Sequence, residues 1–230
     1  MVYVTGDLHG EWSRFRTRGM HQLHRGDTLL VCGDFGFLWD GSKKEQSILK
    51  RMGTLPFQIA FVDGCHENFD LLNACPVEEW NGAPVHRVAK NVVHLMRGHV
   101  YTIEEHTYFA FGGGHSGDLE FRDEDGTWWE QERPTAEEIR TGMESLEAYD
   151  SQIDYIITHE PPALLKECLG VEASEHVEVH KFFEEIVKAC IYRKWFFGKC
   201  HINKYIPVKF YAVFDAVLPI TIRNTEMGSD

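Results

Sequence analysis

Five short apolar runs, each ending at a compact polar cluster, constrain the fold of this chain more than any other feature. The runs are rich in β-branched and aromatic residues, and four of the five clusters contain glycine. Runs of this kind are typical of buried strands that end at a turn. The runs and their clusters are VYVT before GDLHG, TLLVC before GDFG, FQIAFV before DGCHE, YIIT before HEPP, and KWFF before GKCH.

Helical patterns occupy the stretches between these runs. The segment Thr135–Tyr149 opens with a Thr-x-x-Glu capping-box pattern directly after Pro134, and segments 43–52 and 177–192 are also predicted helices. Strands that alternate with helices indicate an α/β fold, with parallel strands covered on both faces and ligands beyond the strands' carboxyl ends. HTYFAFGGG predicts a sixth strand, and KFYAVFDAVLPITI predicts a terminal hairpin or a pair of strands.

Length and composition favour one globular domain over residues 1–230. The hydrophobic content is 43%, and no repeat, low-complexity tract or long linker divides the chain. Acidic residues outnumber basic ones by 36 to 23, which gives a formal net charge of −13. A surface of this sign repels the phosphates of long nucleic acids and of anionic membranes, so neither is an expected partner. Nothing in the sequence indicates the oligomeric state.

The sequence predicts a cytoplasmic location. No basic-then-apolar leader opens the chain, and no apolar run is long enough to span a bilayer. The six cysteines are scattered and show no CxxC spacing, which favours free thiols in a reducing compartment over a disulfide framework.

Carboxylates and imidazoles follow the ends of the five predicted strands. The carboxyl ends of parallel strands meet at one rim of a sheet, so we expect these side chains to converge. Mixed carboxylate and imidazole ligands suit Mn, Fe or Zn better than Ca or Mg, and paired metals can activate water for attack on phosphorus. The residues, in strand order, are Asp7 with His9, Asp34, His66, His159 and His201.

These residues resemble the signature of the calcineurin-like metallophosphoesterase family, which reads D-x-H, G-D, G-N-H-E, H and G-H-x-H. GDLHGEW and HENFD are further similar to the bacterial phosphatase-like branch of that family. The resemblance implies a four-layer α/β/β/α sandwich. The counterparts here, in the same order, are Asp7-x-His9, Gly33-Asp34, Gly64-Cys65-His66-Glu67, His159 and Gly198-Lys199-Cys200-His201.

The resemblance also implies two sets of metal ligands and a catalytic histidine. His66 would bond a substrate phosphate oxygen or protonate the leaving group, and Glu67 would orient the loop. In the second set, cysteine replaces the family's asparagine and lysine replaces its first G-H-x-H histidine. The first set is Asp7, His9, Asp34 and His201, and the second is Asp34, Cys65, His159 and Lys199.

The two replacements leave three hypotheses open. In the first, which we rank highest, the Lys199 ammonium takes the place of the second cation, because it offers only donors and cannot coordinate a metal. In the second, activity is lost and the fold serves as a binding or regulatory protein. In the third, Cys65 and His159 hold a zinc or iron ion despite the lysine, because a thiolate binds these metals well.

The sequence therefore predicts a metal-dependent phosphoesterase that hydrolyses a phosphate mono- or diester of a small phosphorylated substrate. We expect one divalent ion (Mn, Fe or Zn), with two as the alternative. A lysine in place of a divalent ion would weaken catalysis, because its single charge stabilises the transition state less. For Cys65, a packed residue under the loop remains an equal interpretation.

Overall fold

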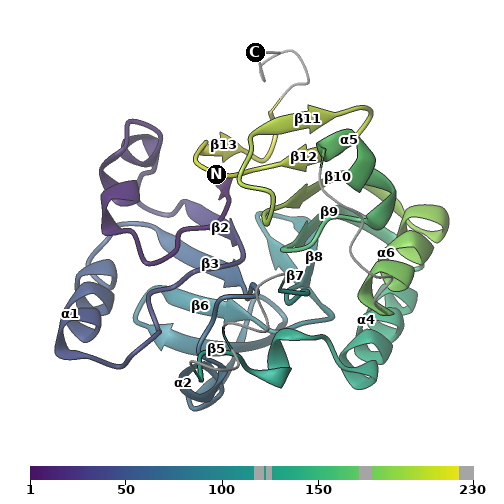
Figure 1. Ribbon diagram of the computed structural model, residues 1–230. Helices are drawn as coiled ribbons and strands as arrows, with labels where there is room; N and C mark the ends of the chain where they lie inside the picture. Colours follow the sequence, from purple (N-terminus) through teal and green to yellow (C-terminus); the bar gives the residue numbers. More distant parts are fainter. Residues whose placement is uncertain (117–121, 123–125, 171–177, 223–230) are drawn as a thin grey trace.

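The structure, a computed structural model, describes residues 1–116, 122, 126–170 and 178–222. Two β-sheets pack face to face, and helices cover the outer face of each (Figure 1). Helices α1 and α2 lie on the first sheet, and α4 and α6 lie on the second. The predicted four-layer α/β/β/α sandwich is confirmed.

The first sheet has the strand order β13-β1-β2-β3-β6-β5-β4. Its central strands β1, β2, β3 and β6 are parallel, whereas β13, β5 and β4 pair antiparallel. The strands are β1 (Val2–Thr5), β2 (Thr28–Cys32), β3 (Gln58–Val62), β4 (Val77–Trp80), β5 (Ala83–Ala89), β6 (Val92–Leu95) and β13 (Leu218–Pro219).

The second sheet has the order β11-β12-β10-β9-β8-β7. Strands β8, β9, β10 and β12 are parallel, and the edge strands β7 and β11 are antiparallel to their neighbours. The strands are β7 (His99–Ile103), β8 (His106–Phe111), β9 (Gln152–Thr158), β10 (Ile191–Phe197), β11 (Lys204–Ile206) and β12 (Phe210–Ala212).

The predicted helices form, with one change of length. Helix α1 has the predicted bounds, and Thr135 caps α4 through the full capping box. Helix α6 ends before residue 191 because that residue begins β10, and residue 177 lies outside the described residues. The helices are α1 (Lys43–Met52), α2 (Phe69–Asn73), α4 (Ala136–Ala148), α5 (Lys166–Leu169) and α6 (Glu178–Ala189), with 3₁₀ turns η1 (Trp12–Arg16), η2 (Met20–Gln22), η3 (Glu130–Glu132) and η4 (Ala163–Leu165).

The apolar core lies in three layers, one between the sheets and one beneath the helices on each side. Helices therefore cover only one face of each sheet, and the other sheet covers the opposite face. Both faces of the central strands are buried, which explains why the runs are continuously apolar instead of alternating. The predicted covering of the strands on both faces is confirmed, with helices on the outer face and the other sheet on the inner face.

Of the two alternatives predicted for the C-terminal segment, the hairpin is wrong: two strands form, but they pair with other strands and not with each other. Strand β12 pairs with β10 and β11 in the second sheet, whereas β13 pairs with β1 in the first. The short segment between them passes from one sheet to the other, and Gly6 N donates to Phe214 O where it crosses the end of β1. This crossing ties the two sheets together beside the rim where β1 and β10 end.

Candidate metal centre

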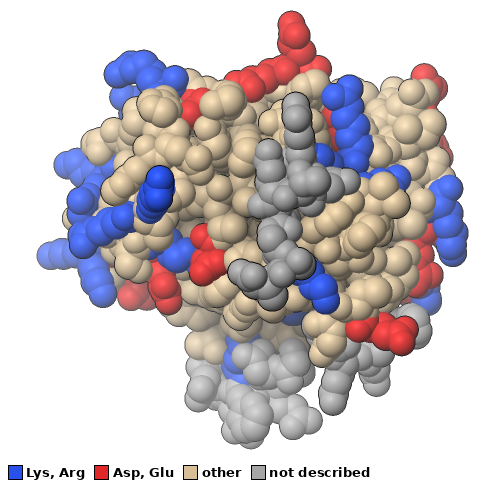
Figure 2. All heavy atoms as spheres, turned by 90° about the horizontal axis from the view of Figure 1, so that it is seen from above, with Lys and Arg blue, Asp and Glu red and all other residues tan. Residues whose placement is uncertain are grey.

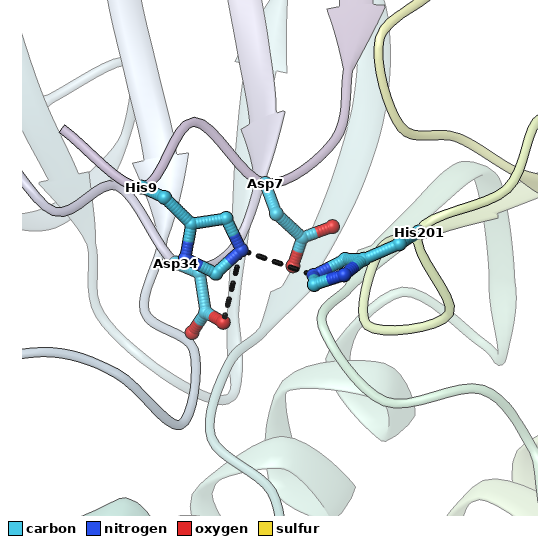
Figure 3. Close-up of side chains that lie close together, drawn as sticks. All are labelled: Asp7, His9, Asp34 and His201. Atoms are coloured by element: carbon cyan, nitrogen blue, oxygen red, sulfur yellow. Dashed lines mark hydrogen bonds and ion pairs between the residues drawn. The ribbon is translucent and has the colours of Figure 1, made fainter. Parts of the chain in front are cut away.

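Four side chains converge at the carboxyl ends of the central strands (Figure 3). Asp7 and His9 follow β1, Asp34 follows β2, and His201 follows β10. One ligand atom from each lies within 4.8 Å of the others, and the Nε2 atoms of His9 and His201 face each other at 3.0 Å. The structure thus brings together all four residues of the predicted first set.

The backbone is strained at this cluster. His9, Asp34 and His201 have φ values of 46°, 43° and 50°, in the left-handed region that residues with a Cβ rarely adopt. Each such conformation costs about 1–3 kcal/mol and persists where the surroundings enforce it, which is common at functional sites. Gly33 is required here, because a Cβ on it would lie 2.1 Å from His159 Nδ1.

The charges at the cluster fit a cation. Burial raises the pKa of the Asp7 carboxyl, and neighbouring Asp34 raises it further. Burial also opposes ionisation of Asp34, but His159 and His66 outweigh it and hold the pKa of that carboxyl below its usual range. Burial lowers the pKa of the His9 imidazole and so favours its neutral form. Two buried carboxyl groups and the imidazoles of His9 and His201 together offer the ligand atoms that a divalent metal ion needs.

His66 is positioned by the carboxylate of Asp34. The His66 backbone N donates to Asp34 Oδ1 at 2.8 Å, and its Nδ1 lies 3.0 Å from Asp34 Oδ2. The His66 side chain is 37% exposed, so substrate can reach the ring at the rim. Glu67 accepts hydrogen bonds from the backbone N of Phe35 and Gly36 in the loop after β2, and burial raises its pKa to about 8.

Lys199 lies beside Cys65, the other replaced residue of the predicted second set. Its ammonium donates to Cys65 Sγ at 2.9 Å and to His115 O at 2.7 Å, and it lies 3.5 Å from Glu160 Oε1. Burial would lower the pKa of Lys199, but Cys65 and Glu160 outweigh that effect and raise it. The lysine therefore keeps its proton and has no lone pair for a metal. Cys65 is fully buried against it.

His159 is fully buried beside the shared carboxylate. Its Nδ1 donates to Cys32 O at 3.0 Å, which leaves Nε2 3.6 Å from Asp34 Oδ1. Burial opposes its charged form, but Asp34 and Cys65 outweigh it and raise the pKa of the imidazole. His159 lies outside the four-residue cluster, next to Asp34.

Glu160 is a site residue that our sequence reasoning missed. Its Oε1 accepts from the backbone N of His115 at 3.0 Å, and its Oε2 lies 3.4 Å from His180 Nε2. Burial opposes its ionisation, but His180 and Lys199 outweigh it and lower its pKa. The available signal was a carboxylate directly after His159 at a strand end, where a ligand-bearing loop begins.

Arg14 was also missed. Its Nη1 donates to Asp7 O at 2.9 Å and its Nη2 to Phe214 O at 2.6 Å. The guanidinium therefore joins the end of β1 to the segment that crosses between the sheets, and it fixes the backbone that presents Asp7. The sequence gives little sign of this role, since both partners are backbone carbonyls.

Comparison with known proteins agrees with this geometry. The family model described as calcineurin-like phosphoesterase matches residues 1–192, so the match ends before Lys199 and His201. No curated protein matches the chain. Among the described residues, none of the helices combines the length and apolar character needed to cross a membrane.

One similar solved structure is described as a putative 5'-nucleotidase from Staphylococcus aureus in complex with alpha-ketoglutarate. The identity is 14% and the TM-score is 0.47, over 94% of this chain and 48% of that chain. The present chain thus spans about half the length of that protein. Because the family model covers most of the sequence, the chain belongs to the calcineurin-like phosphoesterase family.

Proposed function

We propose that this chain hydrolyses a phosphate mono- or diester with water activated by a single divalent ion. Asp7, His9, Asp34 and His201 would hold the ion, and family membership supports phosphoester hydrolysis in general. The observation that carries the single-ion form is the 2.9 Å contact between Lys199 Nζ and Cys65 Sγ. In this proposal the Lys199 ammonium takes the place of the family's second cation.

The proposal assigns a separate task to the metal ligands, to His66 and to Lys199. When bound, a divalent ion lowers the pKa of water and polarises a phosphoryl oxygen. Asp34 orients His66 through two contacts, so that the imidazole can donate a proton to the leaving oxygen. Lys199 supplies a fixed positive charge to a phosphate oxygen.

The charge of Lys199 is partly compensated, so we propose modest catalysis. Glu160 lies 3.5 Å from the ammonium, and Cys65 accepts one of its hydrogen bonds. A single, partly compensated charge stabilises a developing phosphate charge less than a divalent ion would. The natural substrate in this proposal is a small phosphorylated molecule.

The test is the metal content per chain after saturation with manganese and, separately, with zinc, followed by desalting. We expect one tightly held ion in the unaltered protein and none in Asp34→Asn, with hydrolysis of p-nitrophenyl phosphate or its bis-ester only in the former. Two ions per chain would refute Lys199 as the second cation and make Cys65 a ligand. No ion would favour a binding protein.

The rival proposal is a catalytically inactive binding or regulatory protein, and the loss of two second-site residues favours it. Replacing Lys199→His together with Cys65→Asn distinguishes the two proposals. A large activity that arises from almost none would support the rival. Modest activity in the unaltered protein, lost in Asp7→Asn or His66→Gln, would support the enzyme.

Location, metal identity and domain organisation belong to the same proposal. All six cysteines are free, which supports a reducing compartment such as the cytoplasm. The donor set supports manganese, iron or zinc. We propose further that residues 1–230 act as a single domain, for which one cooperative unfolding transition is the test.

A further inference from the structure

A groove with basic sides lies between the C-terminal end of α1 and the turn after β5. Its volume is about 560 Å³. Leu49, Val88 and Ala89 supply its apolar lining, whereas Lys50 and Lys90 are exposed lysines that line it from α1 and from the turn. Among the residues that the structure describes, no carboxylate lines this groove.

Hydrogen bonds hold the two sides of the groove at a fixed spacing. The Asn91 amide donates to Leu55 O at 3.2 Å and to Phe57 O at 2.7 Å, which ties the turn to the segment that follows α1. The turn lies against the helix end, since a Cβ on Gly53 would be within ordinary van der Waals distance of Lys90 Cβ, at 3.6 Å. The groove is therefore part of the packed fold.

The charge of the groove is opposite to that of the whole chain. The formal net charge is −13, yet neither Lys50 nor Lys90 has an ion-pair partner among the described residues. Figure 2 shows Lys and Arg side chains along the left edge of the molecule, the side on which both the N-terminal segment and α1 lie in Figure 1. An acidic ligand would be attracted here and repelled by most of the remaining surface.

The groove lies away from the metal centre. Strands β2 and β3 are parallel, so α1 must return the chain from the carboxyl end of β2 to the amino end of β3. The metal centre is at the carboxyl ends, and the last residues of α1 lie about 15 Å further along the helix axis than its first. A ligand in the groove is thus separate from the phosphate that is hydrolysed.

We propose that this groove binds an acidic, extended peptide segment of a partner protein. An apolar side chain of the segment would cover Leu49, Val88 and Ala89, and its flanking carboxylates would pair with Lys50 and Lys90. The combination of an apolar lining with lysines distinguishes such a peptide from a plain polyanion, which would leave the lining exposed. This inference does not rest on the proposed hydrolytic function.

Fluorescence anisotropy with a labelled peptide tests the proposal. The probe is a leucine between two runs of three glutamates, and a second probe carries serine in place of the leucine. The groove variant is Lys50→Glu with Lys90→Glu, and the matched control is Lys181→Glu with Lys188→Glu on α6, which changes the net charge equally. Hydrolysis of p-nitrophenyl phosphate by the groove variant is measured in parallel.

We expect the leucine probe to bind and the groove variant to weaken its binding about tenfold, since two weak ion pairs become repulsions. The control variant keeps the affinity, the serine probe binds more weakly, and the ester hydrolysis of the groove variant equals that of the unaltered protein. Absence of binding, equal weakening in the control variant, or equal binding of the serine probe would overturn the proposal. Displacement by polyuridine RNA as strong as by unlabelled leucine peptide would indicate a general polyanion surface instead.

Carbodiimide crosslinking of the unaltered protein gives a second measurement that needs no variant. The reagent joins a peptide carboxyl to a lysine amine as an amide with loss of water, and mass spectrometry locates the amide. Amides at Lys50 and Lys90 would support the groove. Amides scattered over other lysines, with none at these two, would overturn it.

Discussion

Replacing Arg97 with methionine is expected to destabilise the protein by about 4 kcal/mol, because it leaves a buried carboxylate without its main partner. The Arg97 side chain is 5% exposed and the Asp63 side chain 1% exposed. Arg97 donates to Asp63 through Nε at 2.9 Å and through Nη2, and it also reaches Glu138. Asp63 immediately precedes the loop that carries Cys65 and His66.

The magnitude follows from what the substitution leaves behind. Asp63 keeps only His94 Nε2, at 2.9 Å, as a side-chain partner among the described residues. Removing one member of a buried pair costs about 3–5 kcal/mol. Methionine retains apolar contact with Phe69, whose ring centroid lies 5.5 Å from the guanidinium carbon. For a chain of this size, 4 kcal/mol corresponds to a melting temperature lower by about 8–16 °C.

The difference in stability between the unaltered protein and Arg97→Met depends on pH with a definite sign. Burial opposes ionisation of Asp63, but Arg97 and His94 outweigh it and lower the pKa of that carboxyl in the folded protein. Its stabilisation is therefore fully present above the unfolded pKa of about 3.9 and is lost as the pH falls toward the folded pKa. In Arg97→Met, burial prevails and raises the folded pKa. We expect the difference in stability between the two proteins to narrow as the pH falls from 7 to 4.

The assay is thermal unfolding by circular dichroism, at pH 7 and at pH 4, with chelator present so that metal does not contribute. Arg140→Met is the control, since the Arg140 side chain is 63% exposed and pairs with Glu137 and Glu144 at the surface of α4. We expect that control to cost about 0.5 kcal/mol. A loss in Arg97→Met no larger than in the control, or a difference that widens in acid, would refute the reasoning.

Three further predictions concern the metal centre and α4. His66→Gln is expected to lower kcat by about 10²–10⁴-fold, and elemental analysis should find the metal content unchanged; a loss of metal would instead make His66 a ligand. Lys199→Met is expected to lower kcat/KM for p-nitrophenyl phosphate about a hundredfold, and an activity equal to that of the unaltered protein would show that the ammonium has no catalytic role. Thr135→Ala removes the cap of α4 and is expected to cost about 1 kcal/mol in urea unfolding, whereas an unchanged midpoint would contradict a stabilising capping box.

Local signals in the sequence predicted much of this fold. The strand runs, the bounds of α1 and the capping box at Thr135 each depend on residues within a few positions of one another. The allocation of strands to the two sheets does not depend on such local residues. Strands β12 and β13 are close in sequence yet lie in different sheets, because β12 pairs with β10 and β13 pairs with the distant β1. Only the tertiary packing decides such partners.

The same distinction separates the predicted site residues from the missed ones. Asp7, His9 and Asp34 directly follow strand runs, so a local pattern indicates their position. Partner choice in the surrounding network is nonlocal: Asp63 pairs with a residue 34 positions later, and Glu160 with one 39 positions later. No spacing rule in the sequence indicates such pairs, although every buried charge requires a partner.

The residues around Lys199 are best understood as a unit. A lysine placed alone in a buried cation site would face a large desolvation cost, and burial does oppose its charge here. Glu160 and Cys65 offset that cost, and Glu160 is itself fixed by the backbone N of His115. Replacing Lys199→His alone would leave a cysteine in the asparagine position and a carboxylate without its ammonium. Restoring a second oxygen- and nitrogen-ligated ion therefore requires Cys65→Asn as well, which is why the paired substitution is the decisive variant.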